Sequence, residues 1–180
     1  MAEGKQDIAG LLENIRSRVK EEAMRLILKE AALKIVKYLG LMNKQFKTYR
    51  AEGVVVTEEL EGGGEATIMV AFRPPEWIEI RTLLISTKEM SMELMRECNV
   101  LETLFRLSAD FAELSFCMDE SGNIYAKQNI LVGALSFDVF KEEYNAVYLS
   151  ALIFRKEILP RLKKCVRNYH EIRDAYSSIT

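Results

Sequence analysis

The order in which helical and strand-like patterns follow one another constrains this chain more than any local motif does. A long helical pattern over residues 6–39 precedes three strand-like runs, a second helix, two more strands and a final long helix. Helices placed around antiparallel strands are typical of an α+β domain. The sequence therefore predicts an antiparallel sheet of about five strands in the order α-β-β-β-α-β-β-α, with long amphipathic helices at both ends.

The first helical pattern is close to the heptad seam of a coiled coil. Glu22 and Lys29 interrupt the seam, and further apolar residues widen the apolar face, which favours packing on a domain over a two-stranded seam alone. We expect one long helix, or two joined near residue 20, ending at Gly40 as a C-terminal cap. The seam residues are Ile8, Leu12, Ile15, Val19, Leu26, Leu33 and Val36, and the widening residues are Ala23, Ile27, Ala31 and Ile35.

Three strand-like runs follow, at residues 46–60, 65–73 and 77–85. The first two predict a hairpin, because the three glycines between them allow positive φ without steric cost. The two prolines at 74–75 end the second run, since proline cannot donate a ladder hydrogen bond. Together the runs predict an antiparallel meander. Trp77 opens the third run either as a core anchor or as a hot spot for a partner, and core packing is favoured.

A second helix is expected between the two groups of strands. Ser86 and Glu89 fit a capping box, and the apolar spacing continues to about Leu107. The start of this helix is rich in methionine. Such a stripe is more typical of core or dimer packing than of an adaptable binding surface.

A second hairpin and a last helix complete the pattern. The hairpin is predicted from residues 112–118 and 124–132, which flank an Asp-Glu-Ser-Gly-Asn turn. Ser136 is the expected N-cap of the last helix, whose apolar residues recur every three or four positions. Pro160 should kink or restart this helix, because proline lacks the backbone N–H that an interior position uses.

Composition sets limits on the class of protein. A length of 180 residues predicts a single domain over residues 1–180, with a core at about 20–160 and helical extensions at 1–40 and 160–180. A net charge of −2 and a pI near 5.7 argue against a dedicated nucleic-acid binder. The sequence holds neither a secretory signal pattern nor a run long and apolar enough to span a membrane. We therefore expect a cytoplasmic protein.

Residues that commonly carry chemistry are sparse or scattered. Cys98, Cys117 and Cys165 cannot all pair within one chain, and we expect reduced thiols. With His170 as the only histidine and no CxxC, no metal or cofactor site is predicted, and His170 itself is expected on the surface. The adjacent carboxylate pairs are interpreted as solvated surface, because neighbouring side chains do not converge. These pairs are Glu58-Glu59, Asp119-Glu120 and Glu142-Glu143.

One stretch carries a family resemblance. Glu97-Cys-Asn99, the segment AELSFCMDESGNIYAKQNI and Leu135-Ser-Phe-Asp138 together resemble the YbjN family and its structural relatives, the class I type III secretion chaperones of the CesT kind. The resemblance covers about residues 20–160. It implies a small acidic homodimer without enzymatic activity that binds a client protein as an extended segment. The longer N-terminal region and the segment beyond Pro160 depart from that family, which leaves oligomer geometry and client site open.

The leading functional hypothesis is a non-enzymatic protein-binding module, a secretion-chaperone-like or regulatory adaptor that acts as a homodimer. One alternative is a ligand-binding protein or enzyme with carboxylates gathered at a dimer cleft. Another is an accessory factor that binds a filament or nucleoprotein through its terminal helices, aided by a basic stripe near Lys163. We expect no cofactor, and we expect no membrane as a binding partner. The candidate interface residues are Trp77, Met90, Leu94, Met95, Phe140 and Tyr144.

Overall fold

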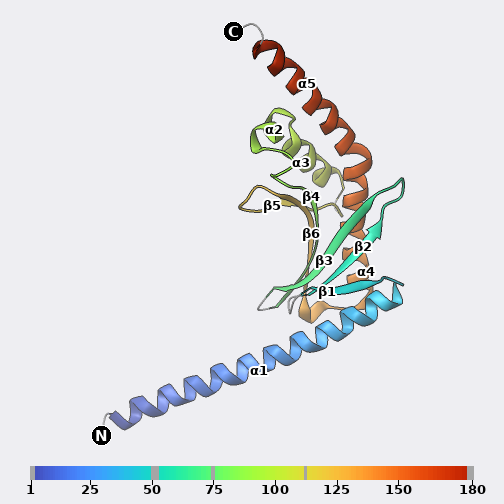
Figure 1. The fold of residues 1–180 in the computed structure, drawn as a ribbon. Coiled ribbons are helices and arrows are strands. Elements are labelled where there is room, and N and C mark those ends of the chain that lie inside the picture. The colour runs from blue at the N-terminus through green and yellow to red at the C-terminus, as the bar shows by residue number, and fades with distance from the viewer. Residues whose placement is uncertain (1–2, 50–52, 74–75, 112, 178–180) are drawn as a thin grey trace.

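The computed structural model describes residues 3–49, 53–73, 76–111 and 113–177. It has the predicted α+β class, with a helix at each end of the chain and an antiparallel sheet between them (Figure 1). The sheet has six strands in the order β1-β2-β3-β4-β6-β5, one more strand than expected. The strands are β1 (Phe46–Tyr49), β2 (Gly53–Glu59), β3 (Glu65–Arg73), β4 (Trp77–Ile85), β5 (Phe116–Met118) and β6 (Ile124–Leu131).

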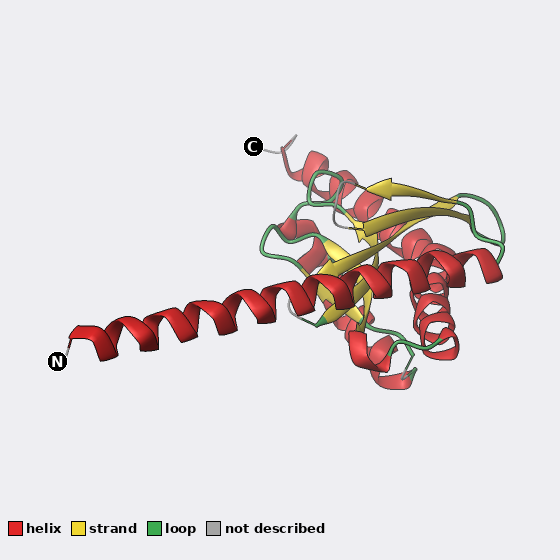
Figure 2. Ribbon diagram, turned by 90° about the horizontal axis from the view of Figure 1, so that it is seen from below, coloured by secondary structure: helices red, strands yellow, loops and turns green. Residues whose placement is uncertain are grey.

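The helices lie around the sheet and at the two chain ends. The first is a single unbroken helix, and most of its length projects away from the sheet (Figures 1 and 2). Among the described helices, none combines the length and the hydropathy that a membrane span requires. The helical elements are α1 (Glu3–Leu41), α2 (Met92–Glu97), α3 (Val100–Asp110), the 3₁₀ turn η1 (Val132–Ala134), α4 (Phe137–Ile153), the π-helical turn η2 (Phe154–Ile158) and α5 (Leu159–Ser177).

The extra strand comes from the first predicted run, 46–60, which forms two strands instead of one. β1 and β2 pair antiparallel, with Tyr49 opposite Gly53. A single strand over the whole run would outlast its partner β3, whereas two shorter strands have ordinary lengths. Gly53 also lets β2 approach β3 closely, since a Cβ at this position would collide with the carbonyl oxygen of Val70.

The helix predicted from Ser86 is wrong in its start and in its continuity. α2 begins at Met92, where the Ser91 hydroxyl accepts a hydrogen bond from the Leu94 amide at 3.3 Å. Ser91 therefore takes the capping role assigned to Ser86. The helix then stops at Asn99, whose φ of +51° lies in the left-handed region that asparagine tolerates better than most residues. α3 starts immediately after it.

The second hairpin is correct in its turn, but its first strand is shorter than predicted. Only Phe116–Met118 forms β5, and residue 112 lies outside the described residues. The Asp119 carboxylate accepts hydrogen bonds from the amides of Ser121 at 3.0 Å and Asn123 at 2.9 Å. Hydrogen bonds from Asn123 and its neighbours hold the pKa of Asp119 below its usual value. The DESGN segment thus folds as a side-chain-stabilised turn.

A hydrophobic core between α4 and one face of the sheet contains a polar exception. Glu58 is only 8% exposed, so its predicted place on the solvated surface is wrong. Its carboxylate accepts hydrogen bonds from the Tyr144 hydroxyl at 2.5 Å and from Lys44 Nζ at 2.8 Å. Burial and this hydrogen bond raise the pKa of Tyr144 far above its ordinary value. The three side chains join α4, β2 and the segment that follows α1.

The last helical region accommodates Pro160 without a break in the helix. Ser136 is the N-cap of α4, as predicted, accepting from the Val139 amide at 3.3 Å. Directly before the proline, the amide of Leu159 donates a hydrogen bond to the carbonyl of Phe154, five residues back. This spacing is that of a π-helical turn. The helix thus contains a widened turn just before the proline, which lacks a backbone N–H, and α5 continues beyond Pro160.

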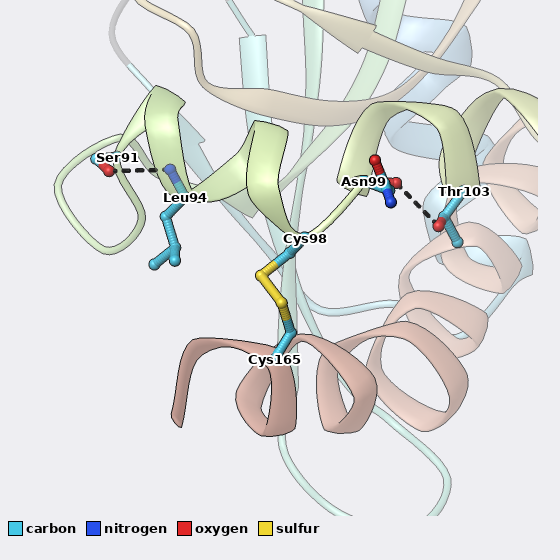
Figure 3. Close-up of a disulfide and its surroundings, with 6 residues drawn as sticks. All are labelled: Ser91, Leu94, Cys98, Asn99, Thr103 and Cys165. Carbon is cyan, nitrogen blue, oxygen red and sulfur yellow. Dashed lines mark hydrogen bonds between the residues drawn. A yellow bond between two sulfur atoms is a disulfide. The ribbon is translucent and has the colours of Figure 1, made fainter. Parts of the chain in front are cut away.

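Two of the three cysteines form a disulfide, which overturns the prediction of reduced thiols. Cys98, at the end of α2, is bonded to Cys165 in α5 (Figure 3). The pair is separated by 67 residues, so neighbouring sequence offers no sign of it. Cys117 is the free cysteine, and burial raises the pKa of its thiol.

Candidate functional site

A groove runs along η2 and the start of α5. It consists of three adjoining hollows that all share Arg155 and Leu159 as lining residues. One hollow lies between β3 and β4, one beside the β2–β3 turn, and one under the segment between β4 and α2. The apolar residues that line the groove are Leu60, Ala66, Leu83, Leu84, Ile85, Met90, Ala151, Phe154, Leu159, Leu162 and Val166.

The hollow between β3 and β4 exists because these strands stop pairing early. Their register ends at Ile68 opposite Thr82, whereas β4 continues alongside β6 as far as Ile85. The β2–β3 hairpin and β4 diverge beyond that point, and the tips of the hairpin point away from β4 (Figure 1). Residues 65–67 of β3 and 83–85 of β4 therefore face each other across a gap. We name this gap the β3–β4 cleft.

The β2–β3 turn is held close to the helix that forms the opposite wall. Lys156 Nζ lies 3.2 Å from a carboxylate oxygen of Glu61. Gly64 has a φ of +92°, and a Cβ at this position would collide with the guanidinium of Arg155. The backbone conformation favours glycine here, while the exposed Arg155 side chain could move to admit a Cβ.

Arg155 and Lys163 supply cations at the centre of the groove. Both side chains are exposed, and neither makes a hydrogen bond or an ion pair within the described part of the chain. Lys156 differs, because Glu61 partly neutralises it. The groove thus combines an apolar lining with two cationic side chains that can donate hydrogen bonds to a bound molecule.

A second polar cluster lies on the sheet face opposite α4, which we name the open sheet face. Glu79 is 5% exposed, and its carboxylate contacts Lys127 at 2.9 Å, Arg73 at 3.0 Å and Arg81 at 3.3 Å. Burial acts to raise the pKa of Glu79, but hydrogen bonds from Lys127 and Arg73, together with Arg81, outweigh it and hold that pKa below its ordinary value. This carboxylate is an ionised, fully paired acceptor.

The buried carboxylates do not assemble a catalytic site. Glu58 faces α4, while Glu79 lies on the open sheet face, so the sheet separates the two. Burial raises the pKa of the Cys117 thiol, which disfavours the thiolate that a nucleophile needs. Among the described residues, no group of three or more histidine, cysteine or acidic side chains is placed to hold a metal ion. Glu58 and Glu79 thus do not meet at one cleft, whereas Glu113, Glu142 and Glu143 line a separate hollow beside α4.

The predicted interface residues are divided between core and surface. Met95, Phe140 and Tyr144 are at most 1% exposed and belong to the chain's own core, as does Leu94 at 8%. Met95→Asp or Phe140→Asp would therefore place a charge in the core and unfold the protein, before any test of an interface. Met90 is half-buried and lines the groove.

Trp77 is 46% exposed, so the favoured core position is wrong. It begins β4 on the open sheet face, because the alternation of the strand turns Ile78 and Ile80 to the core. Sequence reasoning missed Arg155 and Leu159 altogether. The only signal near them was Pro160, which indicated an irregular turn but no groove.

Neither a protein-family model nor a curated protein matches this sequence. Solved structures with a similar fold exist. An uncharacterized protein from Methanothermobacter thermautotrophicus is 14% identical, with a TM-score of 0.50 over 73% of this chain and 99% of the other. A chain of the ExsC–ExsE complex is 14% identical, with a TM-score of 0.48 over 72% of this chain and 94% of the other.

The Yersinia pestis type III secretion chaperone SycH, solved in complex with a stable fragment of YscM2, is 8% identical to this chain. Its TM-score is 0.40, over 69% of this chain and 95% of the other. At these identities the likeness concerns the fold, and no functional conclusion follows from the scores below 0.5. The YbjN part of the resemblance stays a prediction.

Proposed function

We propose that this protein is a non-enzymatic protein-binding module, chaperone-like or adaptor-like, that acts as a homodimer and holds an extended segment of a client polypeptide in the groove. The observation that carries the proposal is the β3–β4 cleft. Its walls are strand backbones that have stopped pairing with each other, and its lining is largely apolar.

The cleft suits an extended polypeptide for two physical reasons. Unpaired edges of β3 and β4 offer backbone donors and acceptors to an added strand, which is a recurring mode of peptide recognition. Alternate side chains of such a strand point to one side, where Leu60, Ala66 and Leu159 form an apolar surface. Arg155, which has no partner in the described residues, can donate to a carboxylate or carbonyl of the client.

The experiment is a selection of peptides from a phage-displayed random library on the immobilised full-length protein, followed by affinity measurement by fluorescence polarisation. Selected peptides should bind the wild type and lose about ten-fold or more in affinity on Leu159→Asp and on Arg155→Glu. Phe105→Asp is the matched control, because Phe105 is 67% exposed on α3 and lines none of the three hollows.

Hydrogen exchange locates the bound peptide. Amides of residues 65–67 and 83–85 should exchange more slowly in the complex if the peptide adds to the unpaired strand edges. Peptides that bind all three variants equally, or that protect other segments instead, would overturn the proposal.

A further inference from the structure

α1 carries an exposed apolar stripe along a stretch that lies outside the body of the molecule. Only its last third is anchored, through Ala31, Ile35 and Leu39, which are at most 3% exposed. The N-terminal part extends beyond the sheet (Figures 1 and 2). The seam side chains remain exposed along the described length, at 52% for Leu12, 48% for Ile15, 63% for Val19, 60% for Leu26, 65% for Leu33 and 41% for Val36.

The stripe and the anchor occupy opposite sides of the same helix. Leu33 lies two residues from Ala31 and from Ile35, which is about half a helical turn in either direction. The body therefore covers one face of α1 and leaves the seam on the other face open. A partner helix could follow the seam from Leu12 to Leu33 on this open face, and at Val36 it would reach the hollow that Val36 lines with Thr48 and Val54.

We propose that the seam of α1 binds the same seam of a second copy of this chain in an antiparallel coiled coil. The antiparallel arrangement that overlaps the seam from Leu12 to Val36 places Leu12 against the partner's Val36 and Ile15 against the partner's Leu33. Val19 then faces the partner's Lys29, and Glu22 faces the partner's Leu26. The two bodies lie at opposite ends of the paired helices, because each body holds only the C-terminal third of its own α1.

The two charges within the seam select this orientation. In a parallel pair each residue meets its own copy, so Glu22 would face Glu22 and Lys29 would face Lys29. In the antiparallel pair, Glu22 and the partner's Lys29 occupy neighbouring layers, within reach of an ion pair, and the two-fold symmetry makes this contact twice. Both side chains are exposed in the single chain, so each is accessible to a partner helix.

The surface involved is large enough for a specific complex. Six seam side chains per chain, each about half exposed, would bury on the order of 1,000 Å² of apolar surface in total, the size at which specific interfaces begin. The overlap from Leu12 to Val36 spans about three and a half heptads, which is within the three to four that indicate a coiled coil. The inference deepens the homodimer part of the proposed function, but it rests on α1 and not on the groove.

The test is disulfide trapping in solution with full-length chains in which Cys117 is replaced by serine. A mixture of Leu12→Cys and Val36→Cys chains should form a cross-linked pair under mild oxidation, while either variant by itself should form none. Self-cross-linking of Leu12→Cys by itself would show a parallel pair and overturn the proposed orientation. No cross-link in any combination would overturn the pairing.

Charge reversal gives an independent readout by analytical ultracentrifugation. Glu22→Lys should weaken dimerisation about ten-fold or more, and the double variant Glu22→Lys/Lys29→Glu should restore it. Leu33→Asp should give monomers, whereas Ile27→Asp, at a 47% exposed position off the seam, should leave the dimer intact. A double variant no tighter than the single one, or equal effects of Leu33→Asp and Ile27→Asp, would contradict the proposal. The groove can fail its peptide test while this dimer stands, and the reverse is also true.

Discussion

The two ends of this chain are both long helices with apolar side chains at helical spacing, yet their apolar residues have different surroundings in the structure. In α5 and the turn before it, Phe154, Ile158 and Leu162 are buried against α2 and α3. The Cys98–Cys165 disulfide ties the same helix a second time (Figure 3). α1 is buried only over its last third, and its seam faces outward. The comparison teaches that a helical stripe indicates a contact without telling whether the contact lies within the chain or outside it.

The largest expected difference between the two ends comes from the disulfide. Cys165→Ser should lower the free energy of unfolding by about 4 kcal/mol, because the cross-link closes a loop of 67 residues in the unfolded chain. Urea denaturation under non-reducing conditions measures this, with Cys117→Ser as the control that leaves the bridge intact. Equal midpoints for Cys165→Ser and the control would show that α5 is no better anchored than α1.

Two neighbouring positions of α1 should separate anchor from seam. Ile35→Ala, at 2% exposure, should cost about 3 kcal/mol of folding stability, since it leaves a cavity against the sheet. Leu33→Ala, at 65% exposure, should leave the stability of the monomer nearly unchanged and weaken self-association instead. Chemical denaturation at low protein concentration distinguishes them, and a similar loss of monomer stability in both would refute the two-faced description of α1.

The polar contact beside the α1 anchor should be sensitive to alkaline pH. Because the pKa of Tyr144 is raised in the folded state, its stabilisation is complete below its unfolded value of 10.0 and declines as pH rises above that value. Tyr144→Phe should cost about 2 kcal/mol at neutral pH, through the lost hydrogen bond to Glu58. The stability gap between wild type and Tyr144→Phe should narrow above pH 10. A constant gap in thermal melts across that range would count against the contact.

The smallest effect is expected at Arg25, an exposed residue beside the seam. In the proposed antiparallel pair the two copies of Arg25 lie near each other across the two-fold axis. Arg25→Ala should therefore tighten the dimer by a few-fold at low salt, in keeping with about 0.5 kcal/mol for an exposed like-charge contact. Sedimentation at two salt concentrations tests this prediction. A weaker dimer for Arg25→Ala would indicate that the two helices pair in another register.

Local chemistry made much of the fold predictable. The glycines at 62–64, the Asp119 turn and the Ser136 cap are each read from a few adjacent residues, and each lies where the sequence indicates. α2 shows the limit of such reasoning, because Ser86 and Ser91 are both good caps and tertiary packing decides between them.

The features that were missed depend on contacts between distant residues. Glu58 is buried because Tyr144, 86 residues away, donates to it. The disulfide joins residues 67 positions apart. The groove arises where β3 and β4 stop pairing, at Ile68 opposite Thr82. The alternation of apolar and polar residues in each strand predicts which face is buried, but it does not predict where the pairing of two strands ends. No local pattern carries this information.

The most direct test of the account is the molar mass of the full-length protein in solution, measured by multi-angle light scattering over a dilution series beside Leu33→Asp. The account predicts twice 20.7 kDa for the wild type and 20.7 kDa for the folded variant. A wild type that stays at 20.7 kDa at the highest concentration, or a variant that stays dimeric, would contradict the claim that the exposed seam of α1 binds a second copy.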